Sequence, residues 1–154
     1  MRQNKREIRD FDQITEVLSR CDTIRLGINN SPFPYVVPLS FGYEIRDGKI
    51  LLYIHGAKEG LKHDLLAKDN HVCVEADICH RFADTGHSVT TIYESVIGFG
   101  QAEKVFGEEA MLGLKLLLEH CGFPDYPICE PKMLEVMTVY RITLDSVTGK
   151  KREL

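Results

Sequence analysis

Short segments with the residue pattern of β-strands dominate this chain, and they restrict the folds open to it more than any other feature. The segments are rich in valine, isoleucine, tyrosine and phenylalanine and are separated by turn signals. Gly98 and Gly100, inside the longest segment, predict a bend or bulge, as at the corner of a barrel. The first three segments follow one another with short turns, which predicts an antiparallel meander. The predicted strands cover residues 23–28, 35–45, 49–55, 71–78, 88–106 and 135–144.

Helices are predicted only between or beside these strands. Asp10 is expected to cap the first helix, with Gln13 in a capping-box arrangement. Six or so antiparallel strands with two or three peripheral helices predict a mainly β protein, a small β-barrel, in one domain spanning residues 1–154. The predicted helices run from residue 11 to residues 20–22, from 60 to 68 and from 108 to 120. The polar or proline-rich segments predicted to be loops are residues 79–87 and 123–131.

Composition argues against several classes of protein. The formal net charge of −4 disfavours nucleic acid as a partner, because a phosphate backbone requires a basic face. The N-terminal sequence MRQNKREIRD lacks the apolar core of a signal peptide, and no apolar run approaches the roughly 20 residues of a membrane-spanning helix. A cytoplasmic protein without membrane contact is expected. No metal site is predicted, because no C-x-x-C pair occurs among the five cysteines, Cys21, Cys73, Cys79, Cys121 and Cys129.

The segment LLYIHGAKEGLKHDLL, residues 51–66, carries the clearest chemical signal. An apolar strand runs into a basic turn, and a helix follows. Gly56 and Gly60 let the backbone approach a ligand closely. Lys58 and Lys62 supply charge-assisted donors beside the unpaired N–H groups of the first helical turn. The segment predicts a phosphate site for a nucleotide-type cofactor, although two solvated lysines at a helix edge would give the same spacing.

Four motifs, in this order, resemble the pyridoxamine 5′-phosphate oxidase-like split-barrel flavoproteins, and most closely their nitroimidazole-resistance (Nim) subgroup. The resemblance spans nearly the whole chain. It implies a homodimer of split β-barrels with FMN in two clefts between the subunits. It also implies electron transfer from FMN to a small molecule, which in the Nim subgroup is reduction of a nitroaromatic to an amine. The motifs are PYVVPLSFGYE at residues 34–44, LYIHGAKEGLKHDLL at 52–66, YESVIGFGQAE at 93–103 and ITLDSVTGKK at 142–151.

The resemblance also implies roles for individual residues. His55 would lie beside the flavin or its phosphoribityl chain, where the pKa range of histidine suits proton donation. Each residue also fits an ordinary structural role, and His63 is expected to be solvated. The phosphate-binding residues would be Lys58, Gly60 and Lys62. The strand beside the isoalloxazine ring would contribute Val37, Pro38, Leu39 and Ser40, and the segment reaching the flavin from the partner subunit would contribute Tyr93, Ser95 and Val96.

The leading functional prediction is an FMN-dependent oxidoreductase that reduces a small planar acceptor, such as a 5-nitroimidazole. A nicotinamide cofactor is a candidate reductant. Three alternatives stay open: a flavin- or haem-binding split barrel without turnover, an oxidase of a pyridoxamine-phosphate-like substrate, and a dimeric barrel that has lost its cofactor. The oxidase needs a further anion site, and Arg81 and Arg141 are isolated in the sequence.

Overall fold

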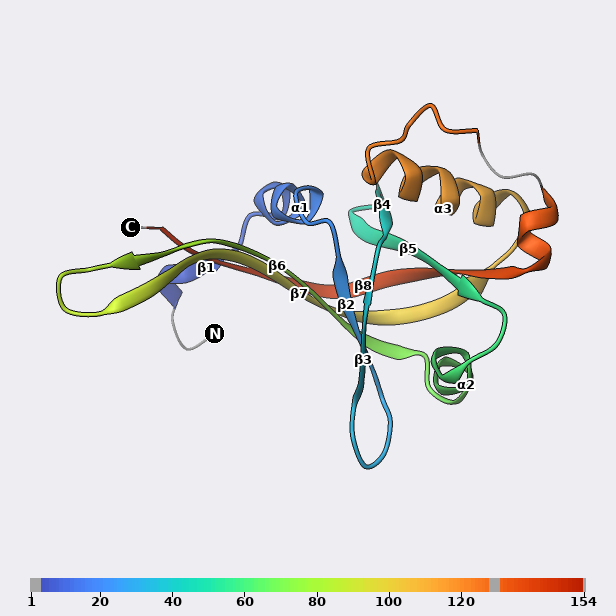
Figure 1. Cartoon of the computed structure of the whole chain (residues 1–154), viewed down its shortest axis with the longest axis horizontal. Coiled ribbons are helices and arrows are strands. Elements are labelled where there is room, and N and C mark those ends of the chain that lie inside the picture. Colours follow the sequence, from blue (N-terminus) through green and yellow to red (C-terminus); the bar gives the residue numbers. More distant parts are fainter. Residues whose placement is uncertain (1–3, 128–130, 154) are drawn as a thin grey trace.

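The computed structural model describes residues 4–127 and 131–153, so residues 128–130 of the predicted 123–131 loop, with Cys129, lie outside the described residues. The eight strands of the described chain form one antiparallel sheet in the order β3-β2-β6-β7-β8-β5-β4, with β1 paired to β8 (Figure 1). The strands are β1 Glu7–Ile8, β2 Ile24–Ile28, β3 Tyr35–Leu39, β4 Gly42–Arg46, β5 Lys49–Ala57, β6 His71–Asp84, β7 Val89–Val105 and β8 Met137–Arg152. The helices are α1 Phe11–Ser19, α2 Leu61–Lys68 and α3 Gly107–His120, with 3-10 turns η1 Asn4–Arg6 and η2 Pro131–Glu135.

Helix α1 begins where the sequence predicts. The Asp10 carboxylate accepts a hydrogen bond of 2.9 Å from the backbone N–H of Gln13, which satisfies one of the unpaired donors of the first turn. Ile14, Val17 and Leu18 then follow at helical spacing and are buried against the sheet. The amphipathic face and the cap therefore both act to fix this helix.

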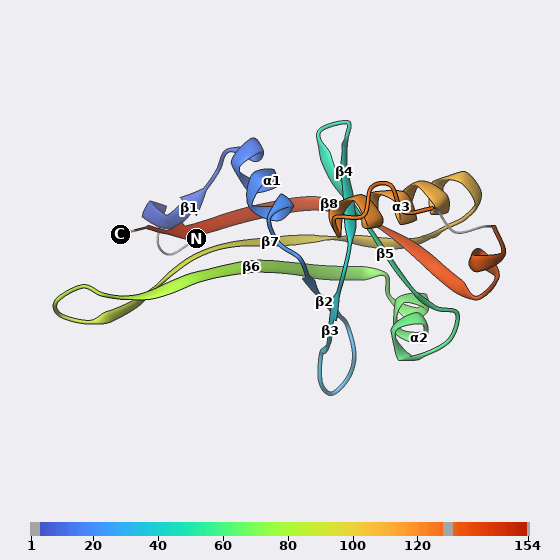
Figure 2. The same ribbon diagram turned by 45° about the horizontal axis from the view of Figure 1, so that its top comes forward.

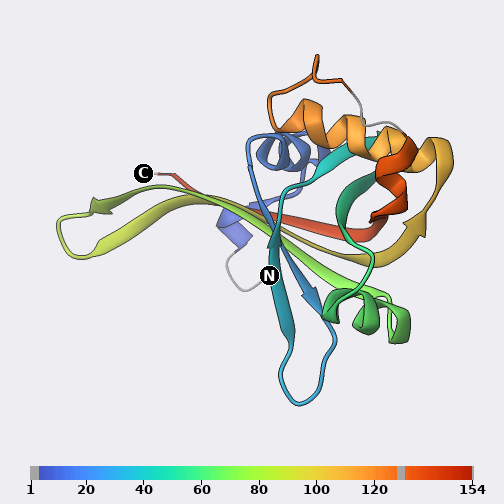
Figure 3. The same cartoon turned by 45° about the vertical axis from the view of Figure 1, so that its right-hand side comes forward.

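The predicted strand at 35–45 is wrong in one respect, because the chain forms two strands there. Strand β3 pairs with β2 and strand β4 pairs with β5, both antiparallel, so the pairings of the predicted meander are confirmed, although each involves only one half of the divided segment. The two strands stand at opposite ends of the sheet, yet the chain from Leu39 to Gly42 spans at most about 11 Å. The sheet must therefore curl until its two ends approach each other. Figure 3 shows this curl, which makes the sheet a barrel.

A long hairpin of β6 and β7 projects from the body of the molecule (Figure 2). The predicted loop at 79–87 is wrong for most of its length, since β6 continues to Asp84 through an irregularity between Cys79 and Arg81. Polar residues are tolerated here because much of the hairpin is exposed. The sequence therefore lacks the apolar alternation by which a strand is predicted. The predicted bulge near Gly98 and Gly100 is confirmed by a register shift at Gly100.

Strand β5 is covered on both faces. Ile50, Leu52 and Ile54 face the main core inside the barrel. Leu51 and Tyr53 face a second cluster, which is formed with helix α3 and strand β8. Helix α3 can approach this closely because Gly113 lies on the Tyr53 ring: a Cβ at position 113 would stand 2.6 Å from Cδ1 of that ring.

We expect Gly113→Ala to destabilise the protein. Helix propensity alone predicts a gain of about 1 kcal/mol from this change. However, the Tyr53 ring is buried and its hydroxyl donates to the Glu44 carboxylate at 2.8 Å, so it cannot yield, and overpacking predicts a loss of about 1–3 kcal/mol.

Urea unfolding measures the sign of this change. Lys115→Ala, on the exposed side of the same helix, is the control and should stay within about 0.5 kcal/mol of the parent. A more stable Gly113→Ala protein would contradict the close packing of α3 on β5.

Candidate functional site

The end of β5, the start of α2 and the turn between them carry Lys58, Lys62, His55 and His63. Gly60 precedes α2 with a φ of +131°, a conformation that L side chains rarely adopt. No side chain caps this helix. The carbonyl of Gly60 accepts the first helical bond, from the N–H of His63 at 2.9 Å. The turn thus presents free backbone donors beside Lys62.

Lys62 lies directly across the end of β5. Its Nζ donates to the carbonyl of His55 at 3.4 Å, and a Cβ at position 56 would stand 2.7 Å from that Nζ. A side chain at position 56 would therefore displace the end of the lysine from this place. Partial burial lowers the pKa of Lys62. The lysine ion pairs of the described chain involve Lys49, Lys115 and Lys151 instead, so Lys62 keeps its charge available for a ligand.

His63 is buried beneath this turn, so the sequence prediction that it is solvated is wrong. It is 6% exposed, and its Nδ1 is hydrogen-bonded to the Tyr140 hydroxyl at 2.7 Å. Burial lowers the pKa of His63. A hydrogen bond to the Ala57 backbone raises it, but by less. The ring is thus neutral and joins α2 to β5 and β8. The sequence carries little signal for this contact, because α2 is short and weakly amphipathic.

His55 and Gly56 point to opposite faces of the sheet because side chains alternate along a strand. His55 is paired with Val139, which belongs to the α3-side cluster, whereas Gly56 lies under Lys62. The His55 ring remains accessible, but the surrounding protein and the Lys62 ammonium lower its pKa. The end of β5 therefore places His55 on the α3 side of the sheet and Gly56 on the opposite side.

Lys58 does not lie with Lys62. It lines a cavity of about 260 Å³ on the α3 side, together with Lys104 and residues of α3 and β8. The structure brings Gly56, Gly60 and Lys62 together as the sequence predicts. The role of Lys58 toward a phosphate stays a prediction.

The segment expected beside a flavin ring forms the edge strand β3. Val37 and Leu39 pack partly against the core, while Pro38 and Ser40 are exposed. Strand β3 stands at the end of the sheet order, which suits Pro38 because it has no N–H for a second partner. The exposed edge leaves backbone groups free for a ligand.

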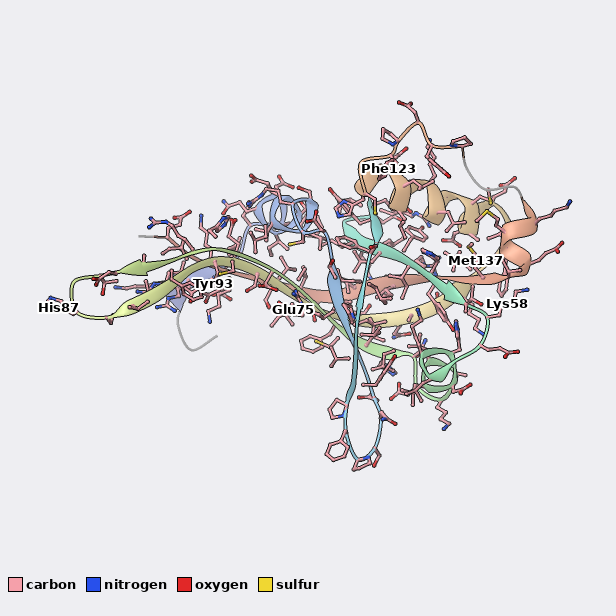
Figure 4. All side chains as sticks on the ribbon, viewed as in Figure 1. Lys58, Glu75, His87, Tyr93, Phe123 and Met137 are labelled. Atoms are coloured by element: carbon pink, nitrogen blue, oxygen red, sulfur yellow. The ribbon has the colours of Figure 1, made fainter. Side chains whose placement is uncertain are left out.

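The segment expected from a partner subunit lies far from Lys58 within one chain (Figure 4). Tyr93 lies on β7, with the Nζ of Lys150 at 5.7 Å from its ring centre. Ser95 is half-buried opposite Asp77. Val96 is 2% exposed in the main core, so only its backbone can meet a ligand. These residues could join the β5 end only from a second copy.

Other kinds of site are not evident in the described part of the chain. Its side chains include no cluster of three His, Cys, Asp or Glu residues able to hold a metal ion. The four described cysteines are free thiols. No helix within residues 4–127 and 131–153 is long and apolar enough to cross a membrane. The cytoplasmic location stays a prediction.

Comparison with known protein families shows to which family this chain belongs. The sequence profile of the pyridoxamine 5′-phosphate oxidase family matches residues 10–151. The chain belongs to this family. Membership confirms the resemblance seen in the sequence motifs. No protein with a curated description matches the chain.

Solved structures of family-like proteins share the split-barrel fold. A candidate 5-nitroimidazole antibiotic resistance protein from Bacteroides thetaiotaomicron has a TM-score of 0.83 and 29% identity, over 94% of this chain and 85% of its own. The flavocytochrome Anf3 from Azotobacter vinelandii has a TM-score of 0.78 and 18% identity, over 100% and 72%. An FAD- and haem-binding protein from Mycobacterium smegmatis has a TM-score of 0.82 and 18% identity, over 97% and 74%. The predicted fold class is confirmed.

In this family member, the neutral His63 predicts a particular dependence of stability on pH. A histidine in the unfolded chain titrates near pH 6.5. Because the pKa of folded His63 is lower, the unfolded state binds more protons below that pH. The free energy of unfolding should therefore fall on acidification from pH 7 to 5.5, by at most about 1.4 kcal/mol per pH unit for this group.

Urea unfolding at several pH values measures this slope. His63→Gln should flatten it, with the remainder coming from His55, whose pKa is also lowered. The exposed His87, at the hairpin tip in Figure 4, provides the matched control His87→Gln, which should keep the parent slope. An unchanged slope in His63→Gln would contradict the neutral buried ring.

Proposed function

We propose that this protein is an FMN-dependent oxidoreductase that reduces a small planar acceptor such as a 5-nitroimidazole. The observation that carries the proposal is the Lys62 ammonium lying across Gly56 at an uncapped helix start, without a carboxylate partner among the described residues. A phosphate dianion fits this charge and these donors. The similar protein associated with 5-nitroimidazole resistance supports the acceptor class, and the flavin-binding neighbours support the cofactor class.

Each part of the site has a task in this proposal. Bound FMN would supply the electrons, as a hydride or singly. Lys62 and the free N–H groups after Gly60 hold the phosphate. The exposed edge from Val37 to Ser40 orients the ring through backbone groups and the Ser40 hydroxyl. His55 is neutral at pH 7 because its pKa is lowered, so its N–H orients the acceptor by a hydrogen bond, and bulk water supplies the proton.

The reductant is proposed by chemical class only. A nicotinamide cofactor suits a flavin, because it delivers a hydride. No dinucleotide-binding fingerprint occurs in the chain, where G-F-G at residues 98–100 lies inside strand β7. The nicotinamide would therefore visit the flavin face without a site of its own.

Binding without turnover is the second candidate, and the haem-binding neighbours favour it. An oxidase of a pyridoxamine-phosphate-like substrate is less well supported. Such a substrate needs an arginine for its phosphate, but Arg141 is paired with Glu109 at 2.7 Å and also with Glu103. Arg81 lies on the projecting hairpin. Neither Arg81 nor Arg141 thus supplies a second phosphate site beside Lys62.

The active unit is proposed to be a homodimer formed through the outer face of the sheet. Val36, Cys73 and Phe99 stand in one row across β3, β2, β6 and β7, with Ile97 in the next row. Val36, Ile97 and Phe99 are exposed, and a groove of about 570 Å³ runs through this row. An apolar face of this kind calls for a partner. A second copy would also bring in Tyr93 and Ser95.

Lys62→Ala should weaken binding of FMN but not of riboflavin. Loss of a hydrogen bond to a charged group removes about 1.5–3 kcal/mol, or roughly 10–100-fold in affinity. Riboflavin lacks the phosphate and should change by less than about threefold. Flavin fluorescence quenching measures both constants, and Lys68→Ala, in the last turn of α2, is the control.

The visible absorption spectrum of the purified protein is measured first, to identify a bound chromophore. FMN bands are expected, and NADPH with a nitroimidazole then tests turnover. A haem Soret band would favour the binding candidate. Absence of any chromophore after incubation with excess FMN would overturn the oxidoreductase proposal, and equal losses for FMN and riboflavin would remove Lys62 from the phosphate.

Phe99→Asp should convert the dimer to a monomer, because it places a charge in the apolar row. Light scattering after size exclusion measures the mass, with an increase in dissociation constant of at least about 100-fold expected for a buried charge. Phe123→Asp, at an exposed position after α3, is the matched control and should stay dimeric (Figure 4). A monomeric parent protein, or a dimer unaffected by Phe99→Asp, would place the interface elsewhere or remove it.

A further inference from the structure

The β6–β7 hairpin carries large apolar side chains beyond the body of the molecule. Its outer part, residues 80–92, forms an arm, and Figure 4 shows His87 at the tip of this arm, far from Lys58. Phe82 is 72% exposed and Val89 is 74% exposed. A two-stranded ribbon is at best marginally stable in water. Two uncovered apolar side chains on such a ribbon therefore indicate a contact outside the described chain.

Polar contacts at its base fix the direction of the arm. The Arg20 guanidinium, next to helix α1, donates two hydrogen bonds to the Glu94 carboxylate, at 2.7 and 2.9 Å. The Nε2 of His80, at the irregularity of β6, lies 2.9 Å from the same carboxylate. The arm is therefore held in one orientation before any partner binds, which lowers the entropic cost of docking it.

The apolar residues of the arm lie on the outer face of the sheet. Side chains alternate along a strand, so every second residue of β7 from Val89 to Phe99 shares one face. Val96, between them, points to the other face and is buried in the core. Phe82 is paired with Thr91, which belongs to the outer set. Phe82, Val89 and Phe99 therefore stand on one continuous face.

The groove of about 570 Å³ lies on this same face, toward the opposite end of the β6–β7 ladder. Pro34, Val36 and Phe99 form apolar walls around the side chain of Cys73. Cys73 is paired with Gly27, where a Cβ would stand 3.5 Å from the Cβ of Cys73, so the glycine leaves space beside the thiol. Ligand pockets span roughly 300–1,000 Å³, so the groove can admit an aromatic ring.

The positions of Phe82 and the groove suit a two-fold axis. Phe82 and Cys73 stand roughly 25–30 Å apart along β6, at about 3.3 Å per residue. Their partners on β7 are Thr91 and Phe99, and Ser95 stands midway between these two. A two-fold axis that passes Ser95 and runs across the strands would place each Phe82 over the groove of the other copy.

The charges around Ser95 permit two copies of this face to meet. Asp77 and Lys150 flank Ser95 on β6 and β8. Arg25 of β2 is bonded to Asp77 at 2.5 Å and to Glu75 at 3.3 Å. Two positive and two negative side chains therefore balance in this region, so the face carries no excess charge that would repel its own copy.

We propose that each arm docks on a second copy of this chain, with Phe82 seated in the groove beside Cys73 of the partner subunit and Val89 at the rim of that groove. This inference rests on the homodimer of the proposed function and names the element that fills its groove. The contact is reciprocal, so one dimer buries two arms and both grooves. Burial removes the apolar surface of Phe82, Val36 and Phe99 from water, which stabilises the dimer.

Disulfide cross-linking locates the arm. Phe82→Cys is made in a chain that keeps Cys73 and the buried Cys21. Diamide should join the thiol at position 82 to Cys73 of the partner subunit, taking up the electrons and protons that the two thiols lose, and give a band at twice the chain mass. A disulfide needs Cα atoms within about 7 Å, so the two positions of one chain cannot form it. Arg81→Cys, on the opposite face of the arm, is the matched control and should not cross-link. The remaining cysteines are replaced by Cys79→Ser, Cys121→Ser and Cys129→Ser.

Sedimentation of Phe82→Ala measures the strength of the contact. Burial of a phenylalanine side chain is worth about tenfold or more in affinity, and each dimer has two such contacts, so the dissociation constant of the dimer should rise about 100-fold. Because Phe82 is exposed within its own chain, this change should leave the fold intact. Phe123→Ala, at an exposed position after α3, is the control and should leave the dissociation constant unchanged.

The outcomes separate the arm contact from the proposed function. Absence of a cross-link in a protein that sediments as a dimer, equal cross-linking of Arg81→Cys, or a cross-link that survives Cys73→Ser would overturn the arm contact and leave the homodimer. An unchanged dissociation constant in Phe82→Ala would also overturn it. A monomeric parent protein would overturn both the arm contact and the homodimer. Failure to bind FMN would contradict only the oxidoreductase proposal.

Discussion

The burial of strand β5 on both faces is the constraint on which the rest of this structure depends. The barrel core covers one face and helix α3 covers the other, so residues 50–54 form an unbroken apolar run. This cover ends just before His55. From that point the alternation of side chains sends one residue to each face, which gives the chain two adjacent but separate chemical environments.

Helix α3 can cover β5 because small residues and ion pairs act together. Gly113 admits the Tyr53 ring, and Gly42 admits the helix backbone, since a Cβ there would stand 2.3 Å from the nitrogen of Leu117. At the rim, Glu109 of α3 is paired with Arg141 of β8 at 2.7 Å. Without α3, Leu51 and Tyr53 would face water and the α3-side cavity would lose a wall. The helix is therefore part of the site although it supplies no charged group to it.

The sequence was sufficient where local signals agree with tertiary packing. The Asp10 cap, helix α3 and the strand-turn-helix at residues 51–66 all carry such signals, and the structure confirms them. It was insufficient where one extended segment serves two sheet edges, because alternation does not show that β3 leaves β2 at Leu39 and that β4 joins β5 at Gly42. The prediction of a loop at 79–87 was wrong because an exposed strand needs no apolar face and so carries no apolar alternation.

In the candidate site, too, local motifs were predictable from the sequence and long-range contacts were not. The grouping of Gly56, Gly60 and Lys62 follows from a contiguous motif and was predictable. The placement of Lys58 in the α3-side cavity depends on residues of β7, α3 and β8 that no local pattern connects to it. Likewise the partner of His63 is Tyr140, a contact across 77 positions of the chain. Long-range contacts of this kind arise only once the sheet order is known.

The site is also electrostatically unbalanced without a ligand. Half-buried ammonium groups lose hydration, and Lys62 recovers only one backbone hydrogen bond of 3.4 Å, which accounts for the direction of its pKa shift. Burial is the main cause of the lowered pKa of His63, and the positive charges of Lys62 and Lys104 lower it further. An anion at this turn would offset the positive charge of Lys62 in the folded state and not in the unfolded state. Ligand binding and stability are therefore coupled through the same lysine.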